Sequence, residues 1–211
     1  MYERPTLVWC IISVMDFIIR KVNREDASKI SRLITHTLRT SNAADYPVDV
    51  LDGICLAYNE AGVMKIIEER YFFCIEAKPK HKHRNDHGHE DKEESYNSHE
   101  NLYKFGLEHG PQILGTGALA ASPLDSSIGW ITAVFVSPDH QGYGLGYAIM
   151  DYLEKEAIKH GITSLKLKAS LTAYDFYKRM GYVDFVETVA DPSQAATAWK
   201  SNLYLMKKEL T

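Results

Sequence analysis

Residues 134–146 read VFVSPDHQGYGLG, and this stretch decides which fold to expect. Its first residues are apolar and typical of a β-strand, a turn follows, and Gly142, Gly144 and Gly146 then open a predicted helix. Glycines let backbone N–H groups approach an anion without side chains in the way, and the aligned peptide dipoles make the helix N-terminus electropositive. The stretch therefore predicts a strand, turn and helix that together bind a diphosphate.

The glycine spacing separates the known kinds of phosphate-binding loop. A dinucleotide fingerprint reads G-x-G-x-x-G and a nucleoside-triphosphate loop ends in Gly-Lys-Ser/Thr, whereas the residues from Gly144 onward provide neither the last glycine nor the lysine. Gln141 to Gly146 instead fits Q-x-x-G-x-G, which resembles the acetyl-coenzyme A signature of the GNAT N-acetyltransferase superfamily. For the loop taken alone, a tight strand-to-helix connection without a ligand stays open as an alternative.

A second segment is similar to another GNAT signature, a short helix that carries Phe-Tyr and ends in Gly-Phe or Gly-Tyr. Residues 169–182 read ASLTAYDFYKRMGY. Thr172 and Asp175 form a capping-box pattern, and Gly181 suits the left-handed position that ends a helix. Residues 202–210 also resemble the closing strand of the family. The resemblance covers residues 16 to 211, with the specific motifs in the second half.

The chain alternates predicted strands and helices, which gives a mixed α/β layer rather than repeated βαβ units. For the GNAT family the expected fold is a mixed, mostly antiparallel central sheet flanked by helices, with two strands that splay apart. Strands are predicted at residues 17–22, 71–77, 113–121, 129–136, 163–169, 183–190 and 203–209. Helices are predicted after the capping residues 23–26, from Pro47 to Glu69 with an interruption at Gly62, at 145–160 and at 172–180.

Length and composition predict one domain. The chain has 211 residues, 45% of them hydrophobic, and we expect a domain at residues 16–211 after an extension at residues 1–15. Residues 78–110 are expected to be an inserted low-complexity loop rich in histidine. Metal binding there, through His81, His83, His87 and His89, is the alternative, but their spacing departs from helical or zinc-finger patterns and no metal is expected.

The charge and the cysteines limit the partners and the compartment. A net charge of −4 and a pI near 6.1 argue against a nucleic-acid or membrane surface. The apolar run at residues 7–14 is too short to span a bilayer. Cys10, Cys55 and Cys74 have no C-x-x-C spacing, so we expect buried free thiols and a cytoplasmic location, the nucleus being the alternative. Exposed strand edges would also allow a homodimer.

The resemblance implies that acetyl-coenzyme A is the co-substrate and that three groups of residues bind it. Backbone groups of the splayed strand meet the pantetheine, backbone N–H groups of the loop hold the pyrophosphate, and the second signature lines the slot between them. These residues are Val134, Phe135 and Val136; Gln141, Gly142, Tyr143, Gly144, Leu145, Gly146 and Tyr147; and Ser170, Ala173, Phe176 and Tyr177.

Tyr177 matches the tyrosine that many GNAT enzymes place near the thioester sulfur, which implies a catalytic role. A thiol pKa of about 8.5 against about 10 for tyrosine makes complete proton transfer to the thiolate uphill by roughly 2 kcal/mol. We therefore expect Tyr177 to donate a hydrogen bond to the departing thiolate. The alternative is that Tyr177 only packs with Phe176 and Met180.

The implied reaction moves acetyl to a primary amine of a small molecule or peptide by direct attack, because no cysteine lies beside the predicted site. Many relatives carry a glutamate on the strand before the loop, but residues 129–134 read GWITAV and contain no carboxylate. Deprotonation is therefore assigned to ordered water or to one of four side chains, His36, Asp45, Tyr46 and Glu76. A non-catalytic acyl-coenzyme A sensor or regulatory module is the alternative function.

Overall fold

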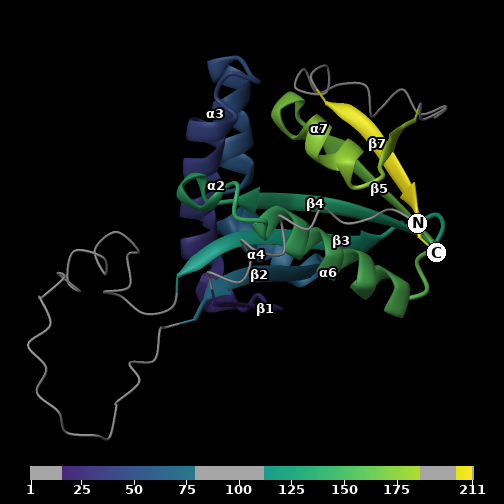
Figure 1. The fold of residues 1–211 in the computed structure, drawn as a ribbon. Coiled ribbons are helices and arrows are strands. Elements are labelled where there is room, and N and C mark those ends of the chain that lie inside the picture. Colours follow the sequence, from purple (N-terminus) through teal and green to yellow (C-terminus); the bar gives the residue numbers. More distant parts are fainter. Residues whose placement is uncertain (1–15, 79–111, 186–202, 211) are drawn as a thin grey trace, which may run out of the picture.

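A central mixed sheet organises the computed structural model, which describes residues 16–78, 112–185 and 203–210 (Figure 1). In these residues the strand order is β1-β2-β3-β4-β5-β7-β6; β4 and β5 run parallel, and the other neighbouring pairs are antiparallel. The mixed, mostly antiparallel sheet is therefore confirmed. The strands are β1 (Phe17–Lys21), β2 (Tyr71–Ala77), β3 (Ile113–Ala121), β4 (Ile128–Val136), β5 (Ser164–Ala169), β6 (Val183–Asp184) and β7 (Tyr204–Glu209).

Helices cover both faces of the sheet. The helices are α2 (Ala27–Ser41), α3 (Val48–Ala57), α4 (Glu60–Glu69), α6 (Leu145–Lys159) and α7 (Leu171–Arg179), with short 3₁₀ turns η1 (Arg24–Asp26) and η3 (Pro138–His140). Figure 1 shows α2 and α4 behind the sheet and α6 in front of it. Residues 23–26 were expected only to cap a helix; Asn23 and Asp26 form a capping box at η1, directly before α2, since each side chain accepts a hydrogen bond from the other's backbone N–H.

Two helix starts differ from the prediction. The break between α3 and α4 falls at Tyr58 and Asn59, and the Asn59 side chain caps α4 by accepting from Gly62 N at 2.9 Å. Gly62 therefore lies inside the first turn of α4, where a Cβ would meet the Ala57 carbonyl oxygen at 2.0 Å. It is a glycine because the end of α3 passes too close for a side chain, not because the helix stops there.

The cap of α7 is Ser170 rather than Thr172. The Ser170 hydroxyl accepts from Ala173 N at 3.3 Å, and the helix begins at Leu171. The Thr172 hydroxyl is used elsewhere, since it donates to Asp45 at 2.7 Å. Serine and threonine are both preferred at a helix start, and Ser170 is the cap here because the Thr172 hydroxyl is bonded to Asp45.

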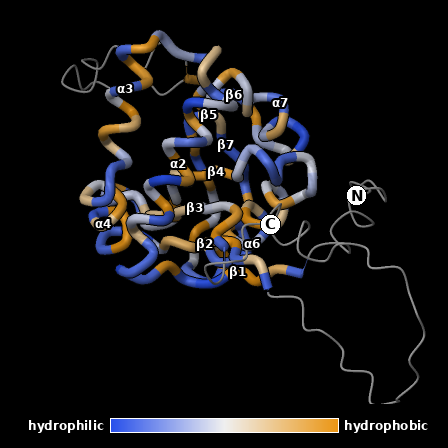
Figure 2. The backbone as a smooth tube through the Cα atoms, turned by 90° about the vertical axis from the view of Figure 1, so that its left-hand side faces the viewer, coloured by the Kyte–Doolittle hydropathy of each residue, from blue (hydrophilic) through white to orange (hydrophobic). Residues whose placement is uncertain are grey.

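Two apolar clusters lie on opposite faces of the sheet. On the α6 face, Ile149 and Leu153 pack against Phe73 and the inward residues of β5; on the other face, Ile30 and Ile34 of α2 belong to the second cluster. Figure 2 shows hydrophobic residues along the strands between α4 and α6. Successive residues of a strand point to opposite faces of the sheet and so belong to the two clusters alternately. Both faces are therefore apolar and are buried by helices.

The thiols of Cys55 and Cys74 are free and buried, as expected. Burial raises the pKa of the Cys74 thiol to about 12, because a thiolate loses its hydration there, and nearby Arg20 only partly opposes this. The thiol therefore stays protonated and unreactive at neutral pH.

A bulge in β4 and the divergence of β4 from β5 open the middle of the sheet. Pairing between the two strands ends at Ile131 and Leu167, so Val134 and Val136 have no β5 neighbour. The register between β3 and β4 shifts at the same level, and Ala133 has a φ of 52°. The Ala133 carbonyl accepts a hydrogen bond from the Thr116 hydroxyl at 2.8 Å. The predicted splay of this strand is confirmed.

Several predictions fall on residues 1–15, 79–111, 186–202 or 211, which lie outside the described residues. These include the N-terminal extension with Cys10, nearly all of the histidine-rich insertion with His81, His83, His87 and His89, and the second half of the strand predicted at 183–190. The described part of that strand is β6. None of the described helices is long and apolar enough to cross a bilayer.

Candidate active site

The glycine turn forms an electropositive helix start. Gly142 and Gly144 have φ values of 82° and 80°, in the left-handed region where a side chain would be strained. Gly144 is the N-cap of α6, and the first intrahelical bond runs from Ala148 N to Gly144 O at 3.0 Å. The N–H groups of Leu145, Gly146 and Tyr147 therefore have no acceptor in their own helix. No acidic residue lies in this first turn, so the turn is suited to an anion.

Gln141 holds this turn against the rest of the fold. Its side-chain amide donates to the Val136 carbonyl at 3.1 Å and to the Ser41 hydroxyl at 2.9 Å. Its own backbone N–H bonds the Pro138 carbonyl at 3.3 Å. The glutamine of the Q-x-x-G-x-G motif thus connects the turn to the end of β4 and to α2.

The two sequence signatures touch each other. A Cβ on Gly146 would come within 3.2 Å of the Phe176 ring, so the ring would have to shift by a few tenths of an ångström to accept a side chain there. The Phe176 ring also lies edge-on to Tyr147 and to Tyr177, with both centroid distances at 5.1 Å. The second signature therefore packs α7 directly onto the start of α6.

Tyr177 is 6% exposed and lines the same opening. Burial is the main reason that its pKa lies above the ordinary value, and the nearby Tyr58 phenol adds to the effect. Its hydroxyl therefore remains protonated at neutral pH. Such a group can donate a hydrogen bond to developing negative charge more easily than it can lose its proton.

A cleft of about 1690 Å³ joins these parts where the sheet splays. Helices α2, α3 and α4 line one side of it, and α7 and the start of α6 line the other. All the predicted coenzyme-binding residues except Tyr143, which is exposed, line the cleft. The lining residues are Val134, Phe135, Val136, Gln141, Gly142, Gly144, Leu145, Gly146, Tyr147, Ser170, Ala173, Phe176 and Tyr177.

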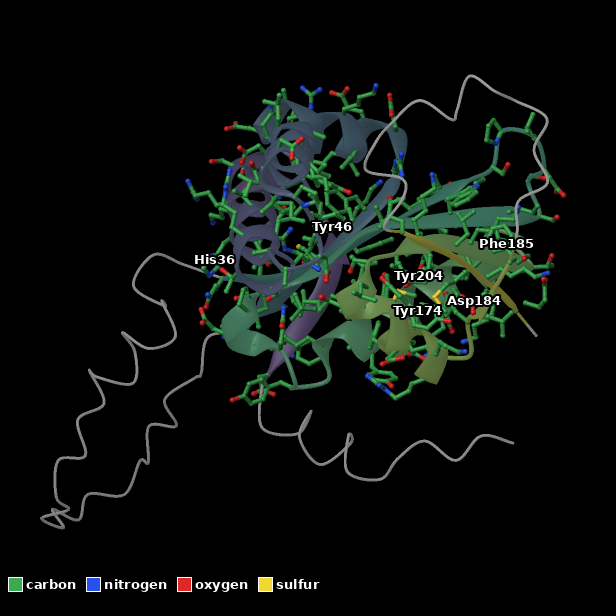
Figure 3. The ribbon with its side chains drawn as sticks, turned by 90° about the horizontal axis from the view of Figure 1, so that it is seen from above. His36, Tyr46, Tyr174, Asp184, Phe185 and Tyr204 are labelled. Atoms are coloured by element: carbon green, nitrogen blue, oxygen red, sulfur yellow. The ribbon has the colours of Figure 1, made fainter. Side chains whose placement is uncertain are left out.

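Of the four side chains considered as a base, Tyr46 alone lines the cleft. His36 is exposed on α2, and Figure 3 shows it at the edge of the molecule, with Tyr46 further inside. Glu76 is ion-paired with Arg20, with Nε to Oε2 at 2.7 Å. The Asp45 carboxylate accepts from Thr172 and Asn42 and is buried. Burial raises the pKa of Tyr46, so its phenol stays protonated at neutral pH and is not available as a base.

Three residues that line the cleft were not predicted from the sequence as site residues, namely Tyr58, Arg70 and Thr132. Arg70 donates from Nη1 to the Thr132 hydroxyl at 2.6 Å. The Tyr58 ring lies edge-on to Phe135, with centroids 5.4 Å apart. Arg70 follows the end of α4, where a basic residue is ordinary. Local pattern therefore gives it no functional signal, because its role depends on a strand 62 residues away.

Comparison with known proteins agrees with this geometry. The model of the acetyltransferase (GNAT) family matches residues 63–182, and the chain belongs to this family. No curated protein is significantly similar to it in sequence.

Three solved structures show the same fold. The PaiA N-acetyltransferase of Thermoplasma acidophilum in complex with coenzyme A is 13% identical, with a TM-score of 0.63 over 92% of this chain and 99% of that one. A GCN5-related N-acetyltransferase of Rhodopseudomonas palustris is 20% identical, with a TM-score of 0.60 over 93% and 98%. The N-acetylglutamate synthase of Neisseria gonorrhoeae, complexed with coenzyme A and N-acetyl-glutamate, is 16% identical, with a TM-score of 0.57 over 93% of this chain and 35% of that one.

Proposed function

We propose that this protein transfers an acetyl group from acetyl-coenzyme A to a primary amine of a small molecule or peptide. One observation carries the proposal: an electropositive glycine turn, an unpaired strand edge and a buried tyrosine line a single cleft. Each of these corresponds to one part of a thioester cofactor, namely diphosphate, amide-containing arm and sulfur. The coenzyme A present in related solved structures supports an acyl-coenzyme A co-substrate.

The cofactor is assigned along the cleft in one direction. Backbone N–H groups from Gly142 to Tyr147 bind the pyrophosphate, because they lie at the positive end of α6. The pantetheine arm bonds the β4 edge at Val134 and Val136, which β5 leaves unpaired. Ser170, Ala173 and Phe176 enclose the arm on the α7 side. The thioester then lies near Tyr177.

The chemistry requires no covalent enzyme intermediate. The amine nitrogen attacks the thioester carbonyl carbon, a C–N bond forms, the C–S bond breaks, and the proton from nitrogen passes to water. Tyr177 donates a hydrogen bond to the sulfur as negative charge develops there. The thiolate is protonated on release and leaves as free coenzyme A. Holding the two reactants in register supplies most of the acceleration in such a ternary complex.

Proton removal is assigned to ordered water rather than to a strand carboxylate. Tyr46 reaches the cleft, but its raised pKa makes it a hydrogen-bonding residue for the acceptor instead of a base. An amine that is already partly neutral at working pH needs no strong base. The absence of a carboxylate from residues 129–134 is also the observation that favours the second candidate, a non-catalytic acyl-coenzyme A sensor.

The two candidates differ in one measurement. Purified protein is mixed with acetyl-coenzyme A and a panel of amines, and release of free thiol is followed over time. Amine-stimulated release supports the transferase. Saturable binding of acetyl-coenzyme A by calorimetry, without release for any amine, would instead establish the sensor.

The setting of the enzyme forms part of the same proposal. Residues 16–211 form its acetyltransferase domain, with the histidine-rich insertion at about 78–110. A cytoplasmic location fits the free, buried thiols of Cys55 and Cys74, and the nucleus is the alternative. A homodimer through an exposed strand edge is the proposed assembly if the protein is not a monomer.

A further inference from the structure

The cleft carries an excess of positive charge although the chain as a whole has a net charge of −4. The charged residues that line the cleft are Lys65, Arg70, Lys166, Lys168 and Arg179 on the basic side and Glu69 and Asp125 on the acidic side. Lys65 lies 3.8 Å from Glu69 across one helical turn, so these two charges offset each other. The basic excess is thus a property of the cleft, to which residues of α4, β5 and α7 and the neighbouring Arg70 contribute, and not of the chain as a whole.

Arg70 is the best-placed of these cations. It is the C-cap residue of α4, and its side chain is fixed by the 2.6 Å bond to Thr132, the first β4 residue beyond the last pair with β5. Arg20, Arg24 and Arg39 each have a carboxylate partner, whereas within residues 16–78, 112–185 and 203–210 Arg70 has none. Its guanidinium is therefore positioned but not neutralised by a described residue.

The hydrogen bond to Thr132 uses one donor of the Arg70 guanidinium, and the remaining N–H groups are suited to bind a carboxylate. Its planar fork matches a carboxylate and can bond both oxygens, which a single ammonium cannot do. The aromatic side chains of Tyr58 and Trp130 also line this part of the cleft. Lys166 and Lys168 lie 5.7 Å and 5.9 Å from the Trp130 ring centroid, and the Asp125 carboxylate offsets part of the Lys166 charge.

The same charge opposes a simple cationic acceptor. A polyamine or other carboxylate-free ammonium would enter a site that repels it, whereas a carboxylate on the acceptor pairs with Arg70. Neighbouring positive charge also favours the neutral form of a bound amine, which is the reactive form. This offers a physical reason why the strand before the glycine turn can lack a carboxylate.

We propose that the acceptor is an amine that also carries a carboxylate, as an amino acid does, and that Arg70 binds this carboxylate as a specificity-determining residue. The inference rests on the proposed acetyltransferase function. The inference adds the class of substrate. Thr132 is the positioning residue for Arg70, because its hydroxyl holds the guanidinium where β4 and β5 begin to diverge.

Matched ligands test the charge requirement. Glycine, L-alanine, L-glutamate and L-phenylalanine are compared with their α-carboxamides and with spermidine, by calorimetry on the protein loaded with coenzyme A. We expect at least one of these amino acids to bind about 10- to 100-fold more tightly than its amide, the range of one charge-assisted pair. The variant Arg70→Gln should lose this preference. Arg32→Gln, an exposed arginine on α2, is the matched control and should keep it.

The outcomes separate this inference from the function on which it rests. Wild-type protein that binds amino acids and amides equally, binds spermidine best or binds none of the panel overturns the inference, as does a preference that survives in Arg70→Gln. Thiol release is measured in parallel with acetyl-coenzyme A. Selective amino acid binding without thiol release would retain the carboxylate site and reject the transferase. Thiol release that is as fast with the amides as with the amino acids would retain the transferase and reject the carboxylate site.

Discussion

At the scale of single residues, Tyr177 bears the most specific expectation. Replacing it with phenylalanine removes the hydroxyl but keeps the ring contacts with Phe176 and Tyr182. Because the lost hydrogen bond is strongest when charge develops on sulfur, we expect kcat to fall about 10- to 100-fold with little change in coenzyme affinity. Thiol-release kinetics and calorimetry measure the two quantities.

Tyr174→Phe provides the control on the same helix. Its hydroxyl donates to Asp184 at 2.7 Å, and Figure 3 shows the pair beside Tyr204. This pair does not line the cleft. The control should turn over at the wild-type rate, and a Tyr177→Phe enzyme that did likewise would remove the tyrosine from the mechanism.

Gly146 gives a second prediction at this scale. In Gly146→Ala the new Cβ presses on the Phe176 ring, so the ring must move away from the start of α6. We expect coenzyme affinity to fall about tenfold, because a small displacement of positioning groups has a large effect. Isothermal titration with coenzyme A measures it.

Gly53→Ala is the comparison, since nothing lies within 4 Å of its added Cβ. Gly53 lies within α3, where alanine is the better helix former, so stability should rise by about 0.5–1 kcal/mol. Urea unfolding tests this, and equal coenzyme affinities for the two variants would refute the steric role of Gly146.

At the scale of elements, the loop between α2 and α3 is attached to the start of α7. Asn42 donates to the Ser170 hydroxyl at 3.3 Å, and the Asp45 carboxylate accepts from the Thr172 backbone and hydroxyl. A carboxylate at a helix N-terminus also interacts favourably with the helix dipole. Asp45→Asn should therefore lower the free energy of unfolding by about 1–2 kcal/mol, as measured by urea denaturation. A variant as stable as wild type would show that the contact contributes nothing.

Local patterns predicted most elements correctly and failed where distant residues decide. The strand, turn and helix around residues 134–146 were predictable because glycine spacing and apolar alternation are local. The contact between Asp45 and Thr172 spans 127 residues, so the cap of α7 was assigned to the wrong residue. Gly62 was misread for a related reason, since the approach of Ala57 is visible only in the folded chain.

The candidate site shows the same division. The residues predicted to bind the coenzyme cluster in two short motifs, and all of them except Tyr143 line the cleft. The proposed acceptor side is formed by α4, β4 and β5, whose charged residues look like ordinary surface residues in the sequence. The role proposed for Arg70 could not be predicted from the sequence, because it depends on the contact with Thr132, 62 residues away.

At the scale of the whole molecule, a partly buried ionic cluster links β1, β2 and the start of α2. Arg20 bonds both Asp26, at 2.7 Å and 2.9 Å, and Glu76. Burial opposes ionisation of Asp26, but hydrogen bonds from Arg20 and from the Asn23 backbone outweigh it, and the pKa of Asp26 is lowered. A lowered carboxyl pKa stabilises the fold above the unfolded-state value, and this stability is lost as pH falls through the folded-state value.

We therefore expect unfolding free energy to fall as the pH drops below about 4, the ordinary value for aspartate. In Asp26→Asn the protein should be less stable at neutral pH, and its stability should decline less between about pH 5 and pH 3. Urea unfolding at a series of pH values gives both slopes. Identical slopes for wild type and variant would show that Asp26 does not govern acid sensitivity.

The bend of β4 at Ala133 has a consequence for the order of binding. Its left-handed backbone is held by a hydrogen bond from the Thr116 hydroxyl, a contact made by the chain itself, so the proposed cofactor would enter a preorganised groove and lose little ordering entropy on binding. For the transferase proposed above, we therefore expect the acyl donor to add before the acceptor, and its binding rate to be the same with or without the amine in solution.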